Sequence, residues 1–161
     1  MNAPAVSDSA CLISLSRIER LNLLPQLFGA VLIPPAVAQE TNIQADWLQV
    51  QAPQNKSLLR LLYSVVDAGE AEAIALASET EHLLIIDDRK GRLWAQRLGV
   101  SVIGTIGVIV RAKREGYLES VRAVLEELQA VGFYLTPRLM NEALRLAREF
   151  PSEQHLFLAG G

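Results

Sequence analysis

The sequence predicts an α/β fold whose parallel sheet carries helices on both sides. Short apolar segments alternate with amphipathic ones through the first two thirds of the chain, which is typical of strands joined by helical crossovers. The segment LLII at residues 83–86 is apolar without interruption, as expected for a parallel strand that is buried on both faces. With 161 residues, of which 50% are hydrophobic, the chain can bury one full core. We therefore expect one domain over residues 1–150 and a loose tail over residues 151–161.

The first third of the chain alternates apolar strand segments with helical ones. Three strands are expected here, at residues 3–7, 29–33 and 46–51. Residues 11–28 place apolar side chains three apart, as an amphipathic helix does, and Pro25 should end or kink this helix. A second helix should open at Pro34 and Pro35, because proline is favoured in the first turn of a helix. The strand at residues 46–51 alternates apolar and polar side chains, which predicts an edge position in the sheet.

The remaining chain predicts two more strands and a series of helices. The strands are expected at residues 82–87 and 100–104. The helices are expected at residues 55–66, 67–80, 89–99, 105–116, 118–132 and 137–150. The last two have apolar stripes that could pack on the sheet, on a second copy or on a partner, and packing within the chain is the favoured interpretation.

Composition excludes several classes of protein and site. The chain carries 15 basic and 18 acidic residues, a net charge of -3, so it lacks the overall basic field of a typical nucleic-acid-binding protein. Cys11 is the only cysteine, which excludes an intrachain disulfide and a cysteine-based zinc site. No role is assigned to the two histidines, His82 and His155. Neither a secretory signal nor a membrane span is recognised, so a cytoplasmic protein without membrane contact is expected.

Carboxylates stand where the predicted strands end or where neighbouring helices begin. Asp8 follows the first strand, and Asp87 with Asp88 follows the LLII strand. Glu40 lies in the helix after the second strand, and Glu70 opens the helix before the LLII strand. Because ligands bind outside the carboxyl ends of such strands, these side chains could converge on one cleft. A metal held by carboxylates would be Mg²⁺ or Mn²⁺.

Each acid also has an ordinary structural explanation. Asp8 and Asp88 can cap the helices that follow them, and Asp67 with Glu70 has the spacing of a capping box. Glu40 can be a solvated helix residue. Taken singly, the structural explanation is favoured at each of these positions.

The adjacent pair shifts this balance toward a metal site. One helix needs one N-cap, so capping does not explain why Asp87 stands beside Asp88, and two adjacent carboxylates repel unless a cation is present. Glu70 and Glu72 are separated by roughly 200° around a helix, so both cannot serve one site equally. Glu70 is preferred as the ligand because it lies nearer the helix start, and Glu72 is held in reserve.

Four segments in this order resemble the PIN domain superfamily. They are VSDSACLISLSRIERLNLL, LIPPAVAQE, DAGEAEAIALA and LLIIDDRKGRLWAQRLGVSVIGTIGVI. More narrowly, they resemble a prokaryotic PIN-like family related to toxin–antitoxin ribonucleases, and the resemblance covers roughly residues 5–115. It implies a three-layer α/β/α sandwich with a mainly parallel sheet and an acidic cleft.

The resemblance also implies an activity and the residues that carry it. Such proteins use carboxylates to bind Mg²⁺ or Mn²⁺ and hydrolyse phosphodiester bonds, often in RNA, so a metal-dependent endoribonuclease is expected. Carried over by position, the catalytic and metal-binding acids are Asp8, Glu40, Glu70 and Asp88, with Asp87 as an additional metal ligand.

Basic and hydroxyl side chains near these acids are expected to bind substrate phosphates. They are Ser9, Arg89, Lys90, Arg92 and Thr105. Phosphate contacts of this kind position a nucleic acid without reading its sequence. For the basic residues a solvated helix face is an equally good explanation, and Thr105 also suits the cap of a strand-to-helix turn.

Two departures from the family pattern support an alternative function. Ala10 stands where the family usually has Ser or Asn, and position 70 is a glutamate where many active relatives have aspartate. The alternative is a catalytically weak module that binds RNA or a partner in a toxin–antitoxin-type complex. The expected partners are RNA more than DNA, an antitoxin-like protein, and a second copy of the chain. A phosphoacceptor receiver domain is disfavoured, because its acid pair follows the first strand, whereas here the pair comes later.

Overall fold

The computed structural model describes residues 2–149 of the chain. The tail predicted at residues 151–161 and His155 lie outside this part. The described chain divides into two compact units, with the boundary between Thr105 and Ile106. The expected extent of a single domain stays a prediction.

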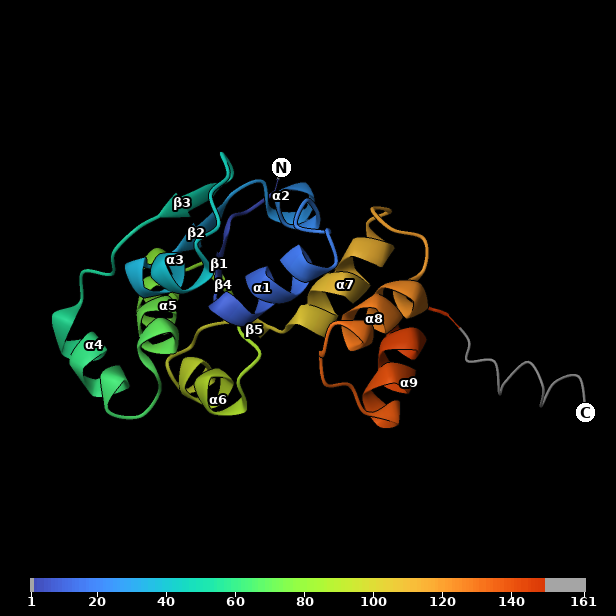
Figure 1. Ribbon diagram of the computed structural model, residues 1–161. Coiled ribbons are helices and arrows are strands. Elements are labelled where there is room, and N and C mark those ends of the chain that lie inside the picture. The colour runs from blue at the N-terminus through green and yellow to red at the C-terminus, as the bar shows by residue number, and fades with distance from the viewer. Residues whose placement is uncertain (1, 150–161) are drawn as a thin grey trace, which may run out of the picture. The chain divides into compact units, whose positions relative to one another are not determined.

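The first unit is built on a parallel sheet, as predicted. Its strands are β1 (Ala5–Ser7), β2 (Val31–Ile33), β3 (Leu48–Val50), β4 (Leu83–Ile85) and β5 (Val102–Ile103). They lie in the order β3-β2-β1-β4-β5, and every neighbouring pair is parallel (Figure 1). The chain therefore moves outward from β1 to β3, then returns to the other side of β1 for β4 and β5. This reversal places the carboxyl ends of β1 and β4 side by side, with Ser7 opposite Ile85.

Helices connect these strands and complete a three-layer α/β/α sandwich. They are α1 (Ser9–Arg17), α2 (Leu23–Phe28), α3 (Pro35–Thr41), α4 (Lys56–Tyr63), α5 (Ala68–Thr80) and α6 (Arg89–Arg97). Helix α1 packs beside α3, whereas α4 and α6 both pack against α5. Right-handed crossovers put the helices before β3 on one face of the sheet and those after it on the other, because the chain reverses direction at the centre.

The core on the α5 side draws alternate residues from the central strands. Val6, Leu32 and Leu84 are buried with Ile74 and Leu76 of α5. Successive strand residues point to opposite faces, so the neighbours of these residues face the other helical layer. Leu84, Ile85 and Ile86 have no exposed surface, whereas Leu83 is partly exposed, so the predicted burial of the LLII segment is confirmed for all but its first residue.

The helix predicted over residues 11–28 is two helices. Helix α1 ends at Arg17, and Glu19 adopts a left-handed conformation with φ 58° before α2 begins at Leu23. Pro25 therefore neither ends nor kinks a helix. It stands in the first turn of α2, where its missing N–H group would have had no partner within the helix.

The second unit begins within the first turn of α7 (Thr105–Arg114) and includes α8 (Val121–Ala130) and α9 (Pro137–Leu146). Helices α8 and α9 pack together. The Glu149 carboxylate accepts a hydrogen bond from the Val121 amide at 2.6 Å and pairs with Lys113 at 3.1 Å. One side chain thereby holds the start of α8 to α7. None of the helices in the described chain is long and apolar enough to cross a membrane.

Candidate active site at the carboxyl end of the sheet

Asp8 lies at the centre of the carboxyl edge and joins two distant parts of the chain. Its Oδ1 atom accepts a hydrogen bond from the Cys11 amide at 3.2 Å, which caps α1. Its Oδ2 atom accepts one from the Asp87 amide at 3.0 Å, across 79 residues of sequence. Only 4% of Asp8 is exposed. The strand-order reversal thus brings the acids that follow β1 and β4 into contact.

Burial and negative neighbours change the ionisation of Asp8. Burial raises the pKa of its carboxyl group to about 7, and the Asp87 carboxylate adds to the rise. The two amide hydrogen bonds oppose the rise, and the charge of Glu70 contributes to it. Near neutral pH the Asp8 carboxyl group is therefore partly protonated, and a cation bound beside it would favour its charged form.

The Asp87–Asp88 pair serves two different helices. The Asp87 carboxylate accepts hydrogen bonds from both the amide and the hydroxyl group of Thr105, at 2.7 and 2.6 Å. Asp88 accepts one from the Gly91 amide at 2.8 Å and caps α6. The inference that capping leaves one member of the pair unexplained is therefore wrong, because Asp87 binds the first residue of α7, a helix 18 residues further along the chain.

Glu70 combines a capping contact with a place beside the other acids. It accepts a hydrogen bond from the Asp67 amide at 3.4 Å while Asp67 accepts one from the Glu70 amide at 2.8 Å, so the capping box at the start of α5 is present. Partial burial raises the pKa of Glu70 to about 7, and the charges of Asp67 and Asp88 add to the rise. Glu70 is thus held at the helix start and is electrostatically coupled to the aspartates.

Glu72 has other partners than Glu70. Its carboxylate accepts hydrogen bonds from the Ala36 amide at 3.0 Å and from the Tyr63 hydroxyl group at 2.6 Å. Helix α3 begins after Pro34, whose side chain offers no acceptor, so Glu72 supplies the cap from α5. Sequence reasoning missed this role because the contact joins residues that are 36 positions apart.

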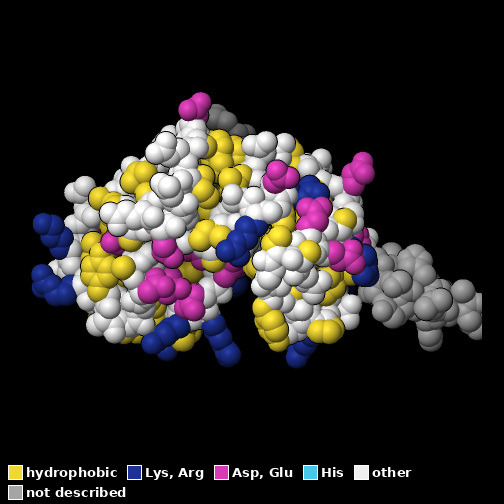
Figure 2. All heavy atoms as spheres, viewed as in Figure 1, with side chains coloured by type: hydrophobic (Ala, Val, Ile, Leu, Met, Phe, Trp, Pro, Cys, Tyr) yellow, Lys and Arg dark blue, Asp and Glu magenta, His cyan; other side chains and the backbone are white. Residues whose placement is uncertain are grey.

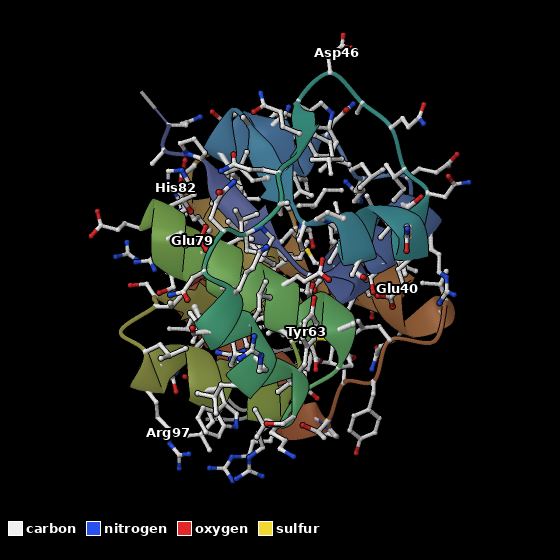
Figure 3. All side chains as sticks on the ribbon, turned by 90° about the vertical axis from the view of Figure 1, so that its left-hand side faces the viewer. Glu40, Asp46, Tyr63, Glu79, His82 and Arg97 are labelled. Atoms are coloured by element: carbon white, nitrogen blue, oxygen red, sulfur yellow. The ribbon has the colours of Figure 1, made fainter. Side chains whose placement is uncertain are left out.

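Glu40 approaches the same edge from α3. Its Oε1 atom accepts a hydrogen bond from the Ser9 hydroxyl group at 2.8 Å. The same atom would stand 2.9 Å from a Cβ atom built on Gly69, so the glycine leaves room for the carboxylate at the start of α5. Figure 3 shows Glu40 on the opposite side of the view from His82, which precedes β4 at the other edge of the sheet.

The hydroxyl side chains hold acids in this structure. Ser9 binds Glu40, and Thr105, which is fully buried, binds Asp87. Cys11 is also fully buried, and burial, with the charges of Asp8 and Asp87, raises the pKa of its thiol well above the ordinary value. The thiol therefore stays protonated near neutral pH.

The acids match a hard divalent cation in chemistry and in charge. Figure 2 shows acidic side chains gathered on one face of the first unit, with basic side chains below them. Oxygen ligands suit Mg²⁺ and Mn²⁺. Burial is the main cause of the raised pKa values of Asp8 and Glu70, and the neighbouring carboxylates add to both. Across residues 2–149, however, no group of three or more acidic, histidine or cysteine side chains is arranged to hold an ion. The carboxylate oxygens are turned to backbone and hydroxyl donors instead.

The basic residues of α6 differ in their surroundings. Arg89 and Lys90 are exposed, whereas Arg92 is partly buried. A Cβ atom built on Gly104 would stand 2.8 Å from the Arg92 Nη1 atom and 2.9 Å from the Asp87 Oδ1 atom. The glycine lets a guanidinium group and a carboxylate approach the same point.

Comparison with known proteins places the chain in a family. No curated protein matches the chain. Among solved structures it is similar to a PilT N-terminus domain protein from the hyperthermophilic archaeon Sulfolobus solfataricus P2, with 19% identity over 83% of this chain and 97% of that chain and a TM-score of 0.39. The family model DUF3368, described as a PIN domain, matches residues 4–149. Since this match spans nearly the whole described chain, the protein belongs to the PIN domain family, whose members are commonly metal-dependent nucleases.

Proposed function

We propose that the protein is a Mg²⁺- or Mn²⁺-dependent endoribonuclease that hydrolyses phosphodiester bonds in RNA. The observation that carries the proposal is the contact between Asp8 and Asp87, which joins two acids from separate strands at the point where the strand order reverses. Membership of the PIN domain family supports the same activity. Action in the cytoplasm is part of the proposal and agrees with the single cysteine.

The chain's own residues would hold the ion and set its position. Asp8, Glu40, Glu70, Asp87 and Asp88 are the proposed ligands. All of them except Asp87 are also the proposed catalytic residues. When bound, such an ion lowers the pKa of water and offsets charge on a phosphoryl group. Hydrogen bonds from neighbouring groups orient ligands of this kind and tune their basicity.

Each proposed ligand is oriented by a group already in contact with it. Ser9 holds Glu40, and the Asp67 amide holds Glu70. Thr105 holds Asp87 through two hydrogen bonds. These contacts limit the freedom of the carboxylates, so part of the ordering needed for a metal site precedes binding.

Cleavage of RNA by the pure protein in the presence of Mn²⁺ tests the proposal. We expect Asp8→Asn to reduce the rate by roughly 10²-fold or more, because it removes the charge of the central acid. Asp46→Asn is the matched control, since Asp46 is exposed on the loop before β3 and lies away from Glu40 in Figure 3. Equal cleavage by the Asp8→Asn protein would assign the activity to a contaminant and reject the proposal.

A second candidate function is binding without efficient catalysis. It is favoured by the absence of a convergent group of ligands within residues 2–149 and by the engagement of both Asp87 oxygens with Thr105. The proposed partners are RNA in preference to DNA, an antitoxin-like protein and a second copy of the chain. Calorimetry separates the two functions, because a binding module takes up RNA or a partner while no heat accompanies titration with Mn²⁺.

A further inference from the structure

The three basic residues at the start of α6 are alike in sequence but not in position. Arg89 and Lys90 are exposed at the first helical turn. Arg92 is partly buried, and roughly 200° of helical rotation separates it from Lys90. An exposed cation interacts weakly with a partner in water, whereas a partly desolvated one interacts more strongly.

Arg92 can approach the acidic edge because residue 104 is a glycine, which leaves room for the guanidinium group. Its Nη1 atom and the Asp87 Oδ1 atom both lie within 3 Å of the point where a Cβ atom of residue 104 would stand, at 2.8 and 2.9 Å. Gly104 is itself buried, whereas Arg92 is only partly buried. The guanidinium group therefore lies beside a carboxylate of the proposed metal site, although it comes from a different element.

The donors of Arg92 are available to a ligand. Asp87 directs its two oxygens to Thr105, and no ion pair or side-chain hydrogen bond within residues 2–149 takes up the Arg92 guanidinium group. A guanidinium group presents five N–H donors in a rigid plane, and this geometry matches two oxygens of one phosphate group. The crowded acids would repel a phosphodiester, and Arg92 places a compensating cation beside them.

We propose that Arg92 binds the phosphate group that is cleaved, while Arg89 and Lys90 contact at most neighbouring phosphates from solvent. The proposal rests on the proposed nuclease function and deepens it by separating three residues that the sequence treats alike. Arg92 acts by direct contact with substrate, and its planar fork rather than its charge alone provides the binding.

Mn²⁺-dependent cleavage of a single-stranded RNA by matched variants tests this assignment. We expect Arg92→Gln to lower kcat by roughly 10²-fold and Arg92→Lys to fall between this variant and the wild type, because lysine keeps the charge and loses the fork. Arg97→Gln is the matched control on the same helix. Arg97 stacks on the Trp94 ring, with 5.3 Å between its Cζ atom and the ring centroid, and in Figure 3 it extends away from Glu40.

RNA binding gives a readout that does not depend on catalysis. In the Asp8→Asn background, the affinity for RNA is measured by fluorescence anisotropy over a range of salt concentrations. Loss of one phosphate contact lowers the salt slope of log K by about 0.7 for a single strand, so we expect this decrease for Arg92→Gln and no decrease for Arg97→Gln. The Mn²⁺ affinity of Arg92→Gln, measured by calorimetry, should equal that of the wild type within about threefold.

The outcomes distinguish this inference from the function on which it rests. If wild type cleaves RNA and Arg92→Gln matches Arg97→Gln in both kcat and salt slope, the inference is overturned and the nuclease proposal stands. If wild type neither cleaves nor binds RNA, both are overturned. If Arg92→Gln does not fold, Arg92→Lys is compared with Arg97→Lys, and equal kcat values overturn the inference.

Discussion

At the scale of the residue, Asp8 is a buried carboxyl group at the centre of the candidate site. Its pKa of about 7 compares with an ordinary value of 3.8, and its carboxylate still receives two amide hydrogen bonds. The sequence placed Asp8 after the first strand from the position of the apolar segment alone. It could not reveal the partner of the second carboxylate oxygen, because Asp87 reaches Asp8 only when β4 pairs with β1.

The stability of the metal-free protein should fall as the pH rises from about 4 to about 7. A carboxyl group whose pKa is higher in the folded state binds its proton more tightly there, so its contribution is complete below pH 3.8 and is lost as the pH passes about 7. Urea unfolding followed by circular dichroism should show a loss on the order of a few kcal/mol over this range. The Asp8→Asn protein should show a smaller loss, and an unchanged dependence would contradict the assignment to Asp8.

Addition of a side chain at Gly104 should disturb Arg92 and Asp87 together. Gly104→Ala places a Cβ atom within 3 Å of both groups, and overpacking of this kind costs about 1–3 kcal/mol of unfolding free energy. Ser101→Ala, at an exposed position before β5, should change the same free energy by less than about 0.5 kcal/mol. The unfolding free energies are measured by chemical denaturation. If Gly104→Ala were as stable as the wild type, the site would accommodate the methyl group and the prediction would be wrong.

At the scale of the element, the acids near the sheet edge accept hydrogen bonds from backbone amides at the starts of several helices. Asp8, Asp67 and Asp88 cap the helices that follow them, as their sequence positions predict. Asp87 and Glu72 serve helices that are distant in sequence, and neither assignment was predictable from local spacing. The division of residues 11–28 into α1 and α2 was also missed, because the apolar periodicity continues through the break at Glu19.

Glu70 and Glu72 should give opposite results when each is changed to glutamine. Glu70→Gln removes a proposed metal ligand, so Mn²⁺-dependent cleavage should fall by more than tenfold while the fold is retained. Glu72→Gln loses an acceptor for either the Ala36 amide or the Tyr63 hydroxyl group, and the unfolding free energy should drop by about 1–2 kcal/mol with cleavage retained. Thermal unfolding and cleavage are measured for both proteins. Loss of cleavage in Glu72→Gln, with cleavage retained in Glu70→Gln, would contradict the assignment.

At the scale of the whole molecule, alternation of strands and helices was sufficient to predict the fold class. The parallel sheet, the edge position of β3 and the burial of β4 are all confirmed. The position of the acids followed from the rule that ligands bind at the carboxyl ends of parallel strands. The direction in which each carboxylate points did not follow, because it depends on contacts such as Asp87 with Thr105 that form only in the folded chain.

Divalent metal should stabilise the folded molecule by an amount that rises with the logarithm of its concentration above Kd. An ion that binds only the folded state adds about 2.7 kcal/mol at a concentration 100 times its Kd. Mn²⁺ should therefore raise the Tm of the wild type, more at pH 8 than at pH 5, because the ligands must lose their protons. The Asp8→Asn protein should show little or no rise, and a shift equal to that of the wild type would locate the ion elsewhere.

The pairing of β4 with β1 also determines when during synthesis the acidic edge can assemble. A nascent chain that ends before β4 contains Asp8 but neither Asp87 nor the strand that carries it, since the two aspartates are 79 residues apart. Non-local pairings of this kind form only after the intervening chain is available to close the loop. The proposed active centre therefore cannot assemble during translation until β4 and Asp87 have emerged from the ribosome. Before that point the nascent chain cannot cleave the message that encodes it.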